Sequence, residues 1–194
     1  MSEHVAVDSG MTVEQWAALP EDEPGELVDG RLVEEEVPDL VHEAVVMFIA
    51  ISLQNWLGER GFAFASGAKY ALGPGRGRMP DVSVFFAPRG LPRRGAVRQA
   101  PDLVVEVLSP TPRDHRRDRV DKLTDYARFG VRFYWLIDPD ARTIEILELT
   151  EGRYTHMLDA GEGKLDDVPG CEGLSLNLDA LWARLDRLGA DGNG

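Results

Sequence analysis

The sequence is poor in cysteine, and Cys171 is the only one among its 194 residues. A single cysteine cannot form a disulfide within the chain, so we expect a cytoplasmic protein. Cys171 lies in the turn-rich stretch VPGCEG, which offers none of the basic surroundings that activate a thiolate. A cysteine nucleophile is therefore not expected.

The sequence also lacks a membrane segment and a targeting signal. It contains no uninterrupted run of about 18 apolar residues. Its first ten residues, MSEHVAVDSG, contain no basic segment followed by an apolar one. We therefore expect no membrane partner. The hydrophobic fraction of 43% suits a globular domain. The length favours one domain over residues 1–190, with a disordered tail at 191–194.

Positive charge is scarce overall but concentrated locally. The net charge is −13, which by itself disfavours nucleic-acid binding. Residues 69–132, however, carry 14 Lys and Arg against 7 Asp and Glu, a net charge of +7 that leaves −20 for the rest. This asymmetry indicates either a face that meets an anionic partner or charges that pair across the fold. The arginines that we expect to contact phosphate, unless they only solubilise loops, are Arg93, Arg94, Arg113, Arg116 and Arg117.

The order of the expected elements indicates an α/β fold. A capping box at Thr12 predicts a short N-terminal helix, and Asp29-Gly30 predicts a hairpin turn. Apolar residues at helical spacing predict a long helix that Asp39 caps and Gly61 ends. Strands are expected at FAFAS, KYALG, DVSVFF, DLVVEVLS, VRFYWLIDP, TIEILEL and RYTHML. Together these elements predict a mixed β-sheet flanked by helices.

Three further segments complete the prediction. GPGRGR is expected to be a loop. A helix should run from SPTPRD to about Phe129, with Val120, Leu123, Tyr126 and Ala127 on its buried face. NLDALWARLDRL should form a C-terminal amphipathic helix.

The most unusual residue is Glu106, a single acid within the apolar stretch DLVVEVLS. A carboxylate in a buried strand must be paired or bound to a metal. Asp81 opens a second strand of this kind, and the two acids converge if the strands are neighbours. Two hard oxygen ligands with room for water suit Mg²⁺ or Mn²⁺, which is the chemistry that phosphodiester cleavage requires.

A cation near these acids could stabilise charge on the phosphate or orient the nucleophile. The chain has only three lysines, at positions 69, 122 and 164. Lys122 lies in the helix that follows the Glu106 strand, and Tyr126 lies one turn further along the same face. An ammonium group differs from a guanidinium in size and in how readily its pKa shifts, so Lys122 is the candidate.

The stretches GELVDGRLVE, MPDVSVF and PDLVVEVLSPTPRDHRRDRVDKLTDYARFGVRFYWLIDP resemble the Uma family of restriction-endonuclease-like proteins, within the PD-(D/E)XK nuclease superfamily. The resemblance covers residues 25 to about 149, with a matching N-terminal helix. It implies a restriction-endonuclease-like core and a divalent metal, Mg²⁺ or Mn²⁺.

The resemblance also implies roles for individual residues. Asp81 matches the first acid of the motif and Glu106 the second, while position 108, where the superfamily has lysine, is Leu108. Lys122 matches the place on the following helix to which the family's lysine has moved. The remaining implied residues are Glu26 as an auxiliary acid, the Val107 carbonyl as a further metal ligand, and His42 and Tyr126 as auxiliary groups.

Three hypotheses remain open from the sequence. The first is a metal-dependent endonuclease that cleaves DNA as a homodimer, with Asp81, Glu106, Lys122 and Glu26 as catalytic residues. The second is a non-catalytic module on the same fold that binds nucleic acid or a protein, which the acidity and Leu108 favour. The third is a structural protein with a Glu106–Lys122 ion pair. Under the third, Glu106→Gln should lower stability by a few kcal/mol, whereas under the first it should raise it.

Overall fold

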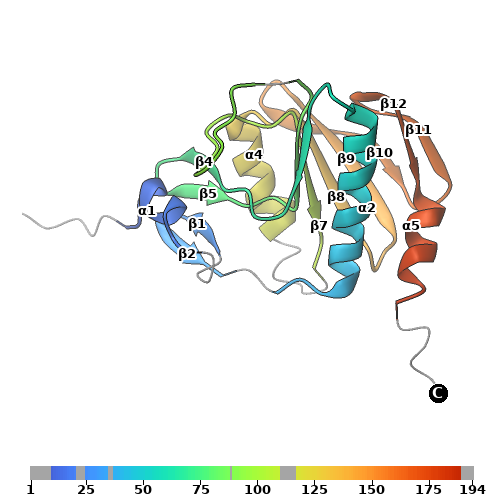
Figure 1. Ribbon diagram of the computed structural model, residues 1–194, viewed down its shortest axis with the longest axis horizontal. Helices are drawn as coiled ribbons and strands as arrows, with labels where there is room; N and C mark the ends of the chain where they lie inside the picture. Colours follow the sequence, from blue (N-terminus) through green and yellow to red (C-terminus); the bar gives the residue numbers. More distant parts are fainter. Residues whose placement is uncertain (1–9, 21–24, 35–36, 88, 110–116, 189–194) are drawn as a thin grey trace, which may run out of the picture.

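The computed structural model describes residues 10–20, 25–34, 37–87, 89–109 and 117–188. The segment 191–194, expected to be a tail, lies outside these residues. The described chain forms a large central sheet, a smaller sheet near the N-terminus and a C-terminal hairpin (Figure 1).

The central sheet has six strands in the order β10-β9-β8-β7-β6-β3. Strands β7 and β8 are parallel, and the other neighbouring pairs are antiparallel, so the predicted mixed sheet is confirmed. The bounds are β3 Phe62–Ala65, β6 Val82–Phe85, β7 Leu103–Val107, β8 Phe133–Asp138, β9 Thr143–Thr150 and β10 Arg153–Ala160. Every residue of β6 and β7 is buried, because helices cover both faces of the sheet centre.

The two faces of the central sheet bury separate apolar cores. On one face, Val105 packs with α2 (Leu40–Leu57), α5 (Leu178–Leu185) and the C-terminal hairpin. On the other face, Val104 packs with α4 (Leu123–Phe129). Glu106 has the same strand parity as Val104 and therefore faces α4. Figure 1 shows α2 and α4 on either side of β7.

The long helix α2 begins as predicted but ends earlier. Asp39 caps it by accepting a hydrogen bond from the His42 backbone N–H. It ends at Leu57 and not at Gly61, because Gly58 adopts a positive φ of 56° that closes the helix. By length and composition α2 is apolar enough to cross a membrane, although polar residues interrupt it. Its apolar side is used in the core, where Ile49 and Leu53 are fully buried.

A second sheet has the strand order β2-β1-β5-β4. It consists of β1 Glu26–Val28, β2 Arg31–Val33, β4 Tyr70–Gly73 and β5 Arg76–Arg78, with α1 (Val13–Ala17) against it. The expected loop GPGRGR is thus wrong in part, since Arg76–Arg78 forms β5. Gly77 is required there because a Cβ would lie 2.4 Å from the Trp16 ring. The absence of apolar residues in β5 hid this strand from pattern analysis.

The helix after β7 differs from its prediction in winding. Residues Arg117–Lys122 form a π-helical segment, η1, that runs directly into α4. The wider turn changes which residues face inward. Val120, expected on the buried face, is 53% exposed, whereas Lys122 and Asp125 are buried. Lys122 lies four residues before the buried Tyr126, a spacing that puts both side chains on the same helix face.

The C-terminal hairpin, β11 (Lys164–Val168) and β12 (Cys171–Asn177), was not predicted. Cys171 begins β12 and is fully buried. Burial raises the pKa of its thiol to about 12, which agrees with the expectation that this cysteine is not a nucleophile. The C-terminal helix α5 is confirmed, and Asn177 caps it.

Candidate active site

Asp81 and Glu106 lie at the same end of two hydrogen-bonded strands. Strands β6 and β7 are antiparallel, with Val82 opposite Val105, so the next step in register places Asp81 beside Glu106. The Val107 backbone N–H donates a hydrogen bond of 2.7 Å to Asp81 Oδ2. The proximity expected from the sequence is therefore observed.

Glu106 is held by two side chains from the π-helical segment and α4. Lys122 Nζ lies 2.7 Å from Glu106 Oε2, and the Tyr126 hydroxyl donates to Oε1 at 2.6 Å. Glu106 is 1% exposed and Lys122 is 3% exposed. Burial, together with the adjacent Glu106 charge, raises the pKa of Tyr126 well above its ordinary value. Tyr126 therefore remains a hydrogen-bond donor.

Leu108, at the position of the superfamily's lysine, is buried in the core on the α4 side. It cannot supply a cation, and Lys122 supplies one to Glu106 from the helix instead. The role of Lys122 as the replacement for the superfamily's lysine stays a prediction.

Glu26 joins the same buried group from β1 and is fully buried. Its Oε2 accepts from Arg78 Nη1 at 2.5 Å, its Oε1 accepts from the Met79 N–H at 3.1 Å, and Lys122 Nζ lies 3.7 Å from Oε1. Burial opposes ionisation of Glu26, but the charges of Lys122 and Arg78 outweigh it and lower the pKa of the carboxyl group. Glu26 is therefore ionised at neutral pH.

Two further residues, Arg78 and Asp125, belong to this buried group and are absent from the sequence-based prediction. Arg78, fully buried in β5, donates from Nε and Nη2 to Asp125 Oδ2 at 2.8 and 2.5 Å. Asp125 lies three residues after Lys122 on α4 and also receives Arg76 Nη1 at 3.5 Å. The helical spacing of Asp125 from Lys122 was visible in the sequence. Arg78 was not identifiable, because its segment was expected to be a loop.

His42, near the start of α2, lies against the other candidate acid. Its Nε2 is 3.3 Å from Asp81 Oδ2, while Nδ1 is buried without a hydrogen-bond partner in the described part of the chain. Burial disfavours the charged ring, but the hydrogen bond and charge of Asp81 outweigh it, so the pKa of His42 is raised. The auxiliary position implied for His42 is thus next to Asp81.

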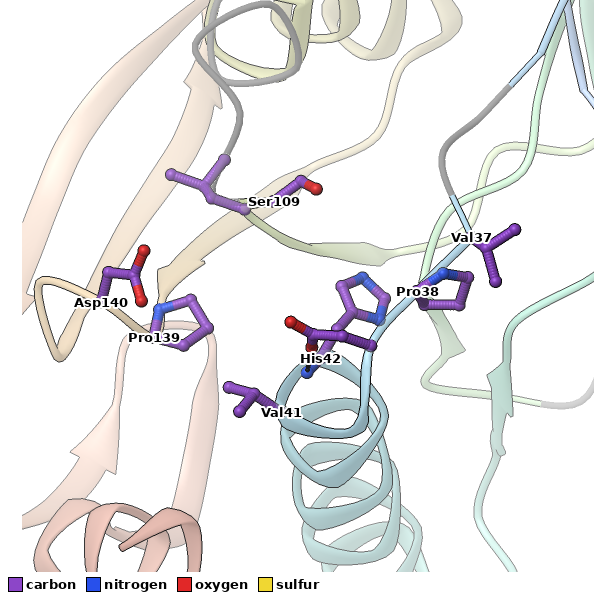
Figure 2. A pocket seen from close by; sticks show the side chains of 9 residues that line it. Val37, Pro38, Val41, His42, Ser109, Pro139 and Asp140 are labelled. Atoms are coloured by element: carbon purple, nitrogen blue, oxygen red, sulfur yellow. Dashed lines mark hydrogen bonds between the residues drawn. The ribbon is translucent and has the colours of Figure 1, made fainter. Parts of the chain in front are cut away.

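A cavity of about 150 Å³ opens beside this end of the strands. Figure 2 shows that its walls come from the start of α2 and from the segments that follow β7 and β8. His42 links the cavity to Asp81. The lining residues are Val37, Pro38, Asp39, Val41, His42, Leu108, Ser109, Pro139 and Asp140.

The two acids fit a divalent cation of the magnesium type. Both contacts that Asp81 makes within the described residues use Oδ2, and the side chain is 18% exposed. Mg²⁺ is commonly held by one or two carboxylates, with water or substrate phosphate completing its shell. The described residues contain no cluster of three His, Cys, Asp or Glu side chains arranged for a metal. The expected Val107 carbonyl ligand stays a prediction.

The arginines expected to contact phosphate are only partly described. Arg93 and Arg94 are exposed in the loop between β6 and β7. Arg113 and Arg116 lie outside the described residues, and of Arg117 only the backbone is described, at the start of η1. Their roles stay predictions.

Comparison with known proteins places this geometry in a family. No curated protein matches the chain. A crystal structure titled as "a putative nuclease belonging to DUF820" from Anabaena variabilis is similar in fold, with a TM-score of 0.71 at 21% identity. The alignment covers 90% of this chain and 99% of that one. The family model Uma2, described as "Putative restriction endonuclease", matches residues 12–179. The chain therefore belongs to the Uma2 family.

Proposed function

We propose that this protein is a metal-dependent nuclease that hydrolyses phosphodiester bonds of DNA. The observation that carries the proposal is the buried Glu106 carboxylate, 2.7 Å from Lys122 Nζ, at the strand end that also carries Asp81. A buried acid and ammonium beside a second acid are unusual in a sheet interior, and buried ionisable groups of this kind are candidates for functional sites. Family membership supports the same reaction class.

In this proposal Asp81 and Glu106 hold Mg²⁺ or Mn²⁺. The cation would polarise the scissile phosphate and acidify the attacking water. Lys122 would donate hydrogen bonds to the phosphate oxygens as negative charge develops there, since an ammonium fixed in a dry site acts without reorganisation. Tyr126 keeps the Glu106 carboxylate in one orientation through its 2.6 Å hydrogen bond. Glu26 lies 3.7 Å from Lys122 Nζ and places a second negative charge beside the ammonium.

The test is cleavage of supercoiled plasmid with Mg²⁺ or Mn²⁺ by the wild type and by Asp81→Ala and Glu106→Ala. Metal-dependent nicking that both substitutions abolish supports the proposal. Lys164→Ala is a suitable control because Lys164 pairs with Asp166 at the surface of the C-terminal hairpin and does not line the cavity. A wild type that is inactive with both metals contradicts the proposal.

The alternative is a non-catalytic module that binds nucleic acid or protein. It is favoured by the observation that each Glu106 oxygen already accepts a hydrogen bond, from Lys122 and from Tyr126. Calorimetric titration with Mg²⁺ and Mn²⁺ separates the two functions. Intact DNA affinity without metal uptake would favour the module, and affinity that falls steeply with salt would implicate the arginines.

We further propose that the protein acts as a homodimer, which would bring two sites to the two strands of a duplex. Support comes from exposed apolar side chains on one surface of α2, where Leu40 is 75%, Met47 53% and Ile51 49% exposed. Sedimentation analysis of the wild type and of Met47→Glu tests this. A monomeric wild type at micromolar concentration would contradict it.

A further inference from the structure

The fully buried Arg78 is the feature that the proposed reaction does not use. It lies in β5, outside the central sheet, yet it contacts both Glu26 of β1 and Asp125 of α4. Its guanidinium therefore joins the N-terminal sheet to the helix that carries Lys122 and Tyr126. A planar group with five donors can hold two carboxylates at fixed angles, which a single ammonium cannot do.

The position of the Lys122 ammonium depends on the charges around it. Lys122 Nζ lies between two carboxylates, 2.7 Å from Glu106 Oε2 and 3.7 Å from Glu26 Oε1. Arg78 contacts Glu26 at 2.5 Å on the other oxygen. The charges of Lys122 and Arg78 both act on Glu26, and Arg78 makes the shorter contact. The unequal distances of Lys122 from its two acids are consistent with this balance.

Arg78 also fixes the helix on which Lys122 lies. Asp125 is three residues after Lys122, on the same side of α4, and is 7% exposed. Two nitrogens of Arg78 donate to its Oδ2. Lys122 lies where the π-helical segment meets α4. The contact between Arg78 and Asp125, about one turn further along, therefore fixes the rotation of the helix about its axis at this point.

We propose that Arg78 is a positioning residue that directs the Lys122 ammonium to Glu106 and away from Glu26. In this proposal the sheet β2-β1-β5-β4 influences catalysis because Arg78 of β5 contacts the helix that follows Lys122. The catalytic half of this inference rests on the proposed nuclease function, whereas its structural half, the location of the ammonium, does not.

The test uses Arg78→Met and Arg78→Lys in the full chain, with Arg76→Met as the matched control. Arg76 lies on the same strand and approaches Asp125 at 3.5 Å, but it is 25% exposed and its described partners do not include Glu26. Crystal structures of the variants locate Lys122 Nζ. Plasmid cleavage gives kcat and KM, and thermal unfolding establishes that each variant is folded.

We expect Lys122 Nζ in Arg78→Met to move within hydrogen-bond distance of Glu26, below about 3.2 Å, and away from Glu106. The kcat should fall about 100-fold, as for a displacement of about 1 Å at a reacting group, with KM nearly unchanged. Arg78→Lys should keep most of the stability and still lose kcat. If Arg78→Met does not fold, Arg78→Lys provides the same two readouts.

Two outcomes would overturn the inference. One is an ammonium that stays on Glu106 in folded Arg78 variants. The other is a kcat equal to that of Arg76→Met. A wild type that does not cleave DNA, combined with an ammonium that moves in Arg78→Met, would refute the proposed nuclease function and leave the positioning role standing.

Discussion

Lys122 Nζ contacts Glu106 Oε2 at 2.7 Å although the two residues come from a π-to-α helix junction and a central strand. Both side chains are nearly fully buried. Their removal from water is costly, and it is repaid only where hydrogen bonds satisfy both groups. Tyr126 supplies one such bond to Glu106. This ion pair is the basis of the first two predictions.

Replacing Lys122 should abolish cleavage and not merely weaken substrate binding. Lys122→Met removes the ammonium, and Lys122→Arg brings a larger group into a site that also holds Tyr126 and Glu26. We expect kcat to fall at least about 100-fold in both. Steady-state cleavage of plasmid is the measurement. Activity of Lys122→Arg near that of the wild type would show that any cation suffices.

Glu106→Gln should lower the free energy of unfolding by about 3 kcal/mol, because it leaves the Lys122 ammonium without its closest carboxylate. Chemical denaturation measures this. Tyr126→Phe is the control, since it keeps the ion pair and removes only the hydroxyl hydrogen bond, at a cost of about 1 kcal/mol.

The structure changes what this stability measurement can decide. The sequence led us to expect that a nuclease would be stabilised by Glu106→Gln, through relief of carboxylate crowding. Lys122 and Arg78 compensate the acids, so a catalytic and a purely structural ion pair now predict the same sign. An increase in stability would contradict the observed ion pair.

The metal-free protein should lose stability at the His42–Asp81 contact as pH rises. The pKa of His42 is raised in the folded chain above its ordinary value of about 6.5. The stabilisation is therefore complete below pH 6.5 and is lost as pH rises through the raised pKa. Chemical unfolding in the presence of a chelator, repeated in steps of about one pH unit between about pH 5.5 and 8.5, measures this loss of stability. His42→Gln should remove this dependence, and an identical pH profile for both proteins would contradict it.

Asp81→Asn should remove metal binding while leaving the fold intact. Asp81 accepts the Val107 N–H through one oxygen, and an asparagine oxygen can accept the same bond. The lost charge, however, weakens a hard cation site. Calorimetry with Mn²⁺ should show no heat of binding for the variant. The unfolding midpoint reports whether the fold is kept, and uptake equal to that of the wild type would exclude Asp81 as a ligand.

The central strands and the two acids could be predicted from the sequence because burial leaves a strong pattern. Glu106 is the only charged residue within β7 (Leu103–Val107), and Asp81 directly precedes the equally apolar strand β6. The condition that these two strands are neighbours is met, since β6 pairs with β7. The metal-ligand roles are not tested by the fold and stay predictions.

Other parts were hidden for identifiable physical reasons. Strand β5 has no apolar side chain, and its central Gly77 is there because Trp16 leaves no room for a Cβ. Helical periodicity of 3.6 placed Val120 inward, whereas the π-helical turn exposes it. Arg78 and Asp125 are brought together over 47 residues of sequence by the contact between β5 and α4, and such a long-range pair has no local signal.

The most direct measurement of the central claim is the anomalous diffraction of a crystal soaked in Mn²⁺. The account predicts one peak at the end of β6 and β7, with Asp81 and Glu106 oxygens within about 2.0–2.6 Å of the ion. A peak elsewhere, or a Glu106 carboxylate that contacts only Lys122 and Tyr126 at saturating Mn²⁺, would contradict it.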